Sequence, residues 1–218
     1  MWKSCLRLIG PAAWRRLALL GMSLFIAGCG ASLMQQSAEP PTRTYLLEWP
    51  GDSVSPTANP NGPNLLVSPV FAAPGYDTAD IAYIRHPYEI EYFAYHRWVD
   101  TPAHMLGPLL VRAAGQGGLF RSVTEAGSAA HADLRLDSRL LYLQQVWLAQ
   151  ASELQLALSV SLVDAATARV VGSRIISVNE PVAERTPYAG VEAANRAVAR
   201  LLSELQGFLA AQVAAARR

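Results

Sequence analysis

The chain is poor in the residues that many kinds of site require. Among its 218 residues there are two cysteines, four histidines and a single lysine. Both cysteines, Cys5 and Cys29, lie within the first thirty residues, so the rest of the chain has no thiol for a disulfide or for nucleophilic catalysis. The stability of the fold must therefore come from a packed core.

Charge of either sign is also scarce. Charged residues make up 16% of the chain, and the formal net charge is +1. Residues 1–28 hold four basic groups and no acidic group, so the remainder has 14 basic and 17 acidic residues, a balance of −3. Proteins that bind nucleic acid cluster Lys and Arg on one face, and this chain shows no such excess. We therefore expect no nucleic-acid partner.

The apolar run from Leu17 to Ala27 is too short to cross a bilayer, which takes roughly 20 apolar residues. Four basic residues precede it: Lys3, Arg7, Arg15 and Arg16. A basic start, a short apolar core and small residues before a cleavage point are typical of a secretory signal. The sequence Ile26-Ala27-Gly28-Cys29 resembles the lipobox of bacterial lipoproteins, in which the cysteine is lipidated and the chain is cut just before it. A buried cysteine in an apolar helix is the alternative interpretation.

We thus predict that residues 1–28 form a lipoprotein signal peptide and that Cys29 is the lipidation site. Residues 29–42, rich in Ser, Ala, Gln and Pro, are typical of a flexible tether. Two or more acyl chains hold a protein durably on a membrane, whereas one gives marginal attachment. The residue after the cysteine is Gly30, whereas an aspartate at this position would resemble an inner-membrane retention signal. We therefore expect the lipidated protein at the periplasmic face of the outer membrane.

Residues 43–218 are predicted to form a single periplasmic domain. Apolar and charged or polar residues alternate in 134–140 and again in 154–162, which indicates strands with one buried face. The link 164–168 suits a hairpin turn, and 170–178 is its expected return strand. Further strands are expected at 44–49, 65–70, 81–85 and 89–97, with a loop at 50–63.

Two helices are expected. Asp100 or Thr101 followed by Pro102 is typical of a helix start, and the glycine cluster 115–118 is typical of a helix stop. Pro108 is predicted to kink this helix or to shift its start. The second helix begins at Thr186-Pro187 and runs to the C-terminus with an apolar stripe. The sequence therefore predicts an α+β domain: a largely antiparallel sheet with two main helices packed on it, the second at the C-terminus.

Aromatic side chains crowd the stretch from Tyr83 to Trp98. Some of them should fill the core of the sheet, which aromatics favour. Tyr92 and Phe93 fall on opposite faces of a strand, so both cannot be buried in a sheet with one wet face. An exposed remainder would suit a partner, since Tyr and Trp dominate interface hot spots. We predict that Tyr92, Phe93 and Tyr95 contribute to partner binding.

Catalytic signatures are missing from the sequence. The four histidines have none of the short local spacings of metal ligands, and no Gly-x-Ser-x-Gly motif occurs. The glycines at 115–118 follow a helix and precede a strand, whereas phosphate loops run from strand into helix. We expect no enzyme, no catalytic residue, no cofactor and no metal site.

Behind the lipobox the chain carries short segments in a defined order. They are Tyr45-Leu46-Leu47, 66–70, 81–85, 92–98 leading into Pro102 and Leu109-Leu110, 120–123, 132–136, 162–164, 180–182 and 194–202. In this order they resemble the ABC-type transport auxiliary lipoprotein family. The resemblance extends over nearly all of the chain after Cys29.

The resemblance implies a non-catalytic lipoprotein that accompanies an MCE-type substrate-binding protein and ABC permease and ATPase subunits. It further implies a role in lipid transport between the inner and outer membranes, and it allows a homo-oligomer. The alternative is an envelope lipoprotein that binds a soluble ligand or has a structural role without a transporter partner.

Overall fold

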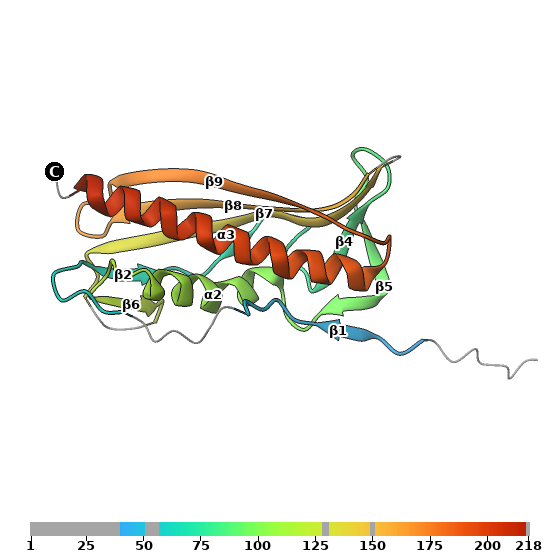
Figure 1. The fold of residues 1–218 in the computed structure, drawn as a ribbon, viewed down its shortest axis with the longest axis horizontal. Helices are drawn as coiled ribbons and strands as arrows, with labels where there is room; N and C mark the ends of the chain where they lie inside the picture. Colours follow the sequence, from blue (N-terminus) through green and yellow to red (C-terminus); the bar gives the residue numbers. More distant parts are fainter. Residues whose placement is uncertain (1–39, 51–56, 128–130, 149–150, 217–218) are drawn as a thin grey trace, which may run out of the picture. The chain divides into compact units, whose positions relative to one another are not determined.

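The computed structural model describes residues 40–50, 57–127, 131–148 and 151–216. Within them, nine strands form one sheet, and two helices pack against it (Figure 1). The strands are β1 (Arg43–Tyr45), β2 (Asn64–Val67), β3 (Phe71–Ala72), β4 (Asp80–Ile84), β5 (Glu91–Trp98), β6 (Ser122–Glu125), β7 (Leu134–Leu148), β8 (Ala151–Asp164) and β9 (Val170–Pro181). The helices are α2 (Pro102–Gln116) and α3 (Pro187–Ala216).

The three longest strands, β7, β8 and β9, pair antiparallel and run side by side (Figure 1). Leu136 lies opposite Leu162, and Leu158 lies opposite Ile176, so the apolar positions of neighbouring strands fall on the same face. All four of these side chains are fully buried. The alternation in the sequence therefore sets the register, because a slip of one residue would turn every leucine to the opposite face.

The other edge of β7 is paired by a series of short parallel strands. The chain from Asn64 to Ile84 follows β7 along its length, so that β2, β3 and β4 pair with it in turn. The break between β2 and β3 falls at Ser68 and Pro69, since proline has no N–H to donate. Ser68 compensates by donating its hydroxyl to Asp137 Oδ1 at 2.7 Å.

Strand β5 carries an irregularity that changes which side chains share a face. Its register against β4 places Ala82 opposite Tyr92 but Asp80 opposite Arg97, so β5 accommodates three more residues than its partner. Extra residues in one strand of a pair form a bulge and bend the strand. The simple alternation expected for this strand is therefore interrupted between Tyr92 and Arg97.

Helix α2 begins where the sequence predicts it. Thr101 Oγ1 accepts a hydrogen bond from the His104 backbone N–H at 3.3 Å, and Pro102 occupies the first turn. The helix continues through Pro108 and ends at Gln116. Gly118 follows with a φ of 60°, a left-handed conformation that glycine adopts without strain.

Helix α3 lies across the sheet on the same side as α2 (Figure 1). Thr186 Oγ1 caps it by accepting from the Ala189 N–H at 3.2 Å. Its apolar stripe is buried and comprises Val191, Ala194, Ala197, Val198, Leu201, Leu202, Leu205, Phe208, Leu209 and Val213. The buried Glu180 of β9 fastens the helix to the sheet, since its carboxylate is 2.7 Å from an Arg200 nitrogen and 3.5 Å from an Arg196 nitrogen.

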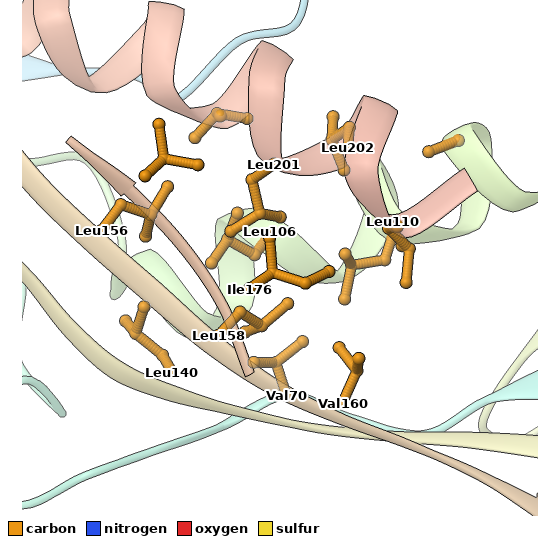
Figure 2. Close-up of a cluster of buried hydrophobic side chains, with 14 of the residues drawn as sticks. Val70, Leu106, Leu110, Leu140, Leu156, Leu158, Val160, Ile176, Leu201 and Leu202 are labelled. Atoms are coloured by element: carbon orange, nitrogen blue, oxygen red, sulfur yellow. The ribbon is translucent and has the colours of Figure 1, made fainter. Parts of the chain in front are cut away.

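The core lies between the sheet and the two helices (Figure 2). Leucine dominates it, with contributions from every layer: Val70, Leu106, Leu110, Leu140, Leu156, Leu158, Val160, Ile176, Leu201 and Leu202. The α+β class, the largely antiparallel sheet and the C-terminal helix predicted from the sequence are thus confirmed.

Several predicted boundaries differ from those observed. The single strand expected at 65–70 is two strands, and β7 continues to Leu148, eight residues beyond the expected end at 140. A bulge between Leu140 and Tyr142 explains the second difference, because it breaks the alternation that marks the strand while the pairing with β8 continues. None of the helices in the described part of the chain is long and apolar enough to cross a membrane.

Candidate interaction surface

An aromatic cluster occupies the helix side of the sheet at one end of the long strands. Tyr83 of β4, Phe93 of β5 and Trp147 of β7 form a triangle, with ring centroids 4.4 Å apart for Tyr83 and Phe93, 5.0 Å for Tyr83 and Trp147, and 5.5 Å for Phe93 and Trp147. These spacings are those of favourable ring contacts. All three side chains are half-buried.

The cluster continues toward β1 and α3 through His96. The His96 ring lies 6.1 Å from Phe93 and stacks on Tyr45 at 5.8 Å, and the Tyr45 hydroxyl is 2.8 Å from His96 Nδ1. Tyr188 in the first turn of α3 lies 6.3 Å from Tyr45 and is 58% exposed. Burial, with a smaller contribution from the Arg43 guanidinium, lowers the pKa of His96 below its ordinary value.

The cluster is left partly open because α3 begins too late to cover it. Gln145, two residues before Trp147 on β7, is 1% exposed, and its Nε2 donates to the Thr186 carbonyl at 3.0 Å. Gly190 lies directly against it: a Cβ there would fall 2.4 Å from Gln145 Cδ. Trp147 therefore lies past the start of the helix, where the sheet has no cover from α3.

The opposite face of the same sheet end carries a second group of tyrosines. Tyr92 is 39% exposed, and its hydroxyl donates to the Gly75 carbonyl at 2.8 Å. Tyr76 donates to Gln144 Oε1. Burial, together with the nearby Tyr92 and Tyr142 hydroxyls, raises the pKa of Tyr76.

The three aromatic residues predicted for partner binding thus occupy different surroundings. Tyr92 lies with Gly75, whereas Phe93 stacks on Tyr83 on the helix side, in line with the expectation that the two fall on opposite faces. Tyr95 is 37% exposed in the irregular part of β5. Tyr45, Trp147 and Tyr188 also belong to the helix-side cluster, although nothing in the sequence pattern singles them out. Sheet pairing brings β1 and β7 to this place, and the packing of α3 on the sheet brings Tyr188.

An ion pair lies beside the cluster. Glu91 accepts from Arg85 Nε at 2.7 Å and from the Tyr83 hydroxyl at 2.9 Å. The hydrogen bond from Arg85 lowers the pKa of the Glu91 carboxyl, and that of Tyr83 is raised by burial and by its bond to Glu91. The arginine therefore favours the ionised form of the Glu91 carboxylate.

One mostly apolar cavity of about 260 Å³ lies beside α2. It is bounded by Val67 and Val70 of the segment around β2, by Ala103, Gly107 and Val111 of α2, and by the end of β6. Ligand sites for small molecules usually exceed about 300 Å³ and carry several convergent polar groups. His104 and Glu125 are the titratable residues at its wall.

The histidines do not converge. His86 lies in the turn between β4 and β5, His104 contacts Asp100 at 3.3 Å, and His131 contacts Asp133 at 3.4 Å. Among the described residues, no group of three or more His, Cys, Asp or Glu side chains could hold a metal ion. Cys29, the predicted lipidation site, lies outside the described residues, as does the whole predicted signal peptide.

The described part of the chain is an α+β domain that exposes aromatic and apolar side chains on its surface. The family model of the ABC-type transport auxiliary lipoprotein component matches residues 45–206. The chain therefore belongs to this family and is an auxiliary lipoprotein component of a transport system.

Solved structures agree on the fold. The protein XCC0632 from Xanthomonas campestris is 22% identical with a TM-score of 0.65, over 79% of this chain and 93% of that one. The hypothetical protein CT253 from Chlamydia trachomatis is 10% identical with a TM-score of 0.52, over 71% and 99% of the two chains. A search of curated proteins found no match.

Proposed function

We propose that this protein is the non-catalytic lipoprotein of an envelope ABC transport system of the MCE type, and that it supports lipid transport between the inner and outer membranes. The observation that carries the proposal is the family match over residues 45–206, which spans the domain from β1 into α3. The partners would be an MCE-type substrate-binding protein and the ABC permease and ATPase subunits.

The proposed attachment is through acyl chains on Cys29, which would hold the domain at the periplasmic face of the outer membrane. Labelled palmitate should enter the wild-type protein and not the Cys29→Ser variant, which should remain an uncleaved precursor. Normal processing of that variant, with label incorporated, would contradict the proposed anchor.

Partner contact is proposed at Tyr92, Phe93 and Tyr95. Tyrosine combines a large apolar surface with a hydroxyl at low conformational cost, which makes exposed tyrosines good interface anchors. Because Tyr92 and Phe93 lie on different faces, one flat partner cannot cover both. A partner that takes up this edge of the sheet would have to wrap around β5, or two partners would have to share it.

The test is affinity purification of the tagged protein from detergent-solubilised envelope, with identification of the proteins and the lipids that co-purify. We expect an MCE-type protein and phospholipid. Tyr92→Ala and Tyr95→Ala should reduce their recovery, while Ile175→Ala, at a more exposed apolar residue on β9, should not. Recovery of neither the MCE-type protein nor phospholipid would refute the transport role.

The second candidate function, a soluble-ligand carrier or structural lipoprotein without a transporter partner, is favoured by the apolar cavity beside α2. In that case a small apolar molecule would co-purify in place of the transport subunits. Gly107→Leu would then abolish its recovery, because nothing lies within 4 Å of a Cβ at Gly107 and a larger side chain would fill the space.

A further inference from the structure

Strand β9 is an edge of the sheet, since it pairs only with β8 (Figure 1). In an antiparallel pair, every second residue directs both its N–H and its carbonyl toward the partner strand. The N–H of Val182, just after β9, donates to the Ser152 carbonyl of β8 at 2.9 Å. The register is unbroken from Gly172 to Pro181, so the even-numbered residues of this stretch bond to β8. The odd-numbered residues therefore direct their backbone groups outward, past the edge of the sheet.

Both ends of this edge are occupied. At one end, α3 supplies donors to outward carbonyls. Arg196 donates to the Pro181 carbonyl at 3.0 Å, and Arg200 donates to the Asn179 carbonyl at 3.4 Å. At the other end, a shift of register makes Val171 an extra residue of β9, and such a bulge bends a strand. We name the stretch between these ends, residues 173–177, the open edge.

The outward backbone groups of the open edge have no hydrogen-bond partner within the described part of the chain. They are the N–H and carbonyl groups of Ser173, Ile175 and Ser177. The one charged side chain of the stretch, Arg174, lies on the helix side, 3.4 Å from Glu204 of α3. Proteins usually protect such an edge with proline, lysine or a covering segment, and an edge without them is a template for a further strand. Ile175 is also 60% exposed, so the open edge offers apolar contact as well as hydrogen bonds.

The open edge is complementary to a second copy of itself. Two antiparallel copies centred on Ile175 place Ile175 opposite Ile175 and Ser173 opposite Ser177. All the outward residues then exchange hydrogen bonds, about six in total. Apolar side chains meet apolar ones, and hydroxyls meet hydroxyls, across the two strands. Arg174 lies opposite Ile176, so no like charges face each other.

Neighbouring registers are less favourable. A shift that centres the pair on Arg174 puts two arginines directly opposite each other, which is destabilising. A shift that centres it on Ile176 places Ser173 opposite Asn179, whose carbonyl α3 already binds. Strands β1 and β6, which end the other path of the sheet, have three and four residues, so pairing with them would be shorter. Charges and donors therefore select the register centred on residue 175.

We propose that two copies of this chain associate through the open edge, antiparallel and about a two-fold axis at Ile175, so that their sheets join into one. Such an interface is isologous: each copy offers the same residues to the other, and the assembly closes as a dimer. The inference does not depend on the transport role. Strands β4, β7 and β8 separate β9 from β5, so pairing at β9 leaves Tyr92 and Tyr95 accessible.

Disulfide formation in the full chain tests the register. Opposite residues that exchange hydrogen bonds have Cα atoms about 5.5 Å apart, within the span of a disulfide. Mild oxidation should therefore link Ile175→Cys, which keeps both backbone groups, into a dimer. Val170→Cys is the matched control: Val170 is 56% exposed on the same strand, but two copies of it would lie on the order of 30 Å apart. Both variants contain Cys5 and Cys29, so any link through those thiols appears equally in the control.

A proline on the open edge separates self-association from folding. Ser177 directs its N–H outward, so Ser177→Pro removes no bond to β8 and should change the Tm little. It removes two hydrogen bonds from each dimer and should weaken self-association about tenfold or more, as measured by sedimentation velocity over a range of concentrations. In the Ile175→Cys background it should also suppress the disulfide. Ser177→Thr keeps the N–H and should behave as the wild type.

The other outcomes contradict the proposal. A wild-type chain that stays monomeric, equal disulfide yields at 175 and 170, or self-association that Ser177→Pro leaves unchanged would show that the open edge is not an interface between copies. A monomer whose Ile175→Cys thiol is shielded from maleimide would mean that another segment of the same chain covers the edge. Shielding that requires added transport subunits would assign the edge to a different protein. The co-purification experiment described above remains the separate test of the transport role.

Discussion

The sheet has two regions that differ in cover. Beneath α3, strands β8 and β9 bury leucine, isoleucine and valine side chains with almost no exposed surface. Past the start of α3, at Trp147 and Phe93, the same face of the sheet carries half-buried aromatic rings. This difference shows that the alternation of apolar and polar residues along a strand decides which side chains share a face of the sheet. Whether that face is a core or a surface depends on whether a helix covers it.

The largest effect is expected in the covered region. Leu201 is fully buried between α3 and the sheet, so Leu201→Ala should lower the free energy of unfolding by about 2–5 kcal/mol through lost burial and a cavity. Urea unfolding followed by circular dichroism measures it. Val170→Ala, at an exposed position of β9, should change it by less than about 0.5 kcal/mol. A small loss at Leu201 would mean that α3 does not cover a core.

A smaller effect is expected at the boundary between the two regions. Gly190→Ala would place a Cβ against the buried Gln145 amide and displace its bond to the Thr186 carbonyl, at a cost of about 1–3 kcal/mol. In the background of Gln145→Ala the same change should cost much less. Denaturant unfolding of both single variants and the double variant gives this coupling. Additive costs would show that the two residues are not in contact.

In the uncovered region, single aromatic residues should matter less. Phe93→Ala removes three ring contacts from a half-buried side chain and should cost about 1–2 kcal/mol, while Tyr95→Ala should cost less than about 0.5 kcal/mol. Thermal unfolding compares the two variants. A similar Tm loss for both would mean that the cluster is not the structural unit that its ring spacings indicate.

The smallest effect is a pH dependence of the same cluster. Because the pKa of His96 is lowered in the folded state, the unfolded state binds the proton more tightly. The contribution of His96 to stability should therefore be full above pH 6.5 and should fall as the pH drops below that value. Tm measured from pH 8 to pH 5 should decline less steeply in His96→Phe, which keeps the stack on Tyr45 without a titrating group. Parallel Tm curves would contradict this.

The sequence alone determined the elements whose signals are local. Alternating residues placed β8 and β9 and their hairpin, and Thr101-Pro102 and Thr186-Pro187 marked both helix starts. It did not determine β6 or the division of the strand at 65–70, because those short segments are strands only by virtue of their partners. The parallel pairing of β1, β2, β3 and β4 is likewise absent from any local pattern.

The candidate surface divides in the same way. An excess of aromatics between Tyr83 and Trp98 was visible in the sequence, and the opposite faces of Tyr92 and Phe93 followed from strand geometry alone. Only the tertiary structure brought Tyr45, Trp147 and Tyr188 into the cluster that contains Phe93, because these residues come from three other elements far apart in the chain. Local sequence sets which face a side chain takes, but contacts between distant segments decide what that face meets.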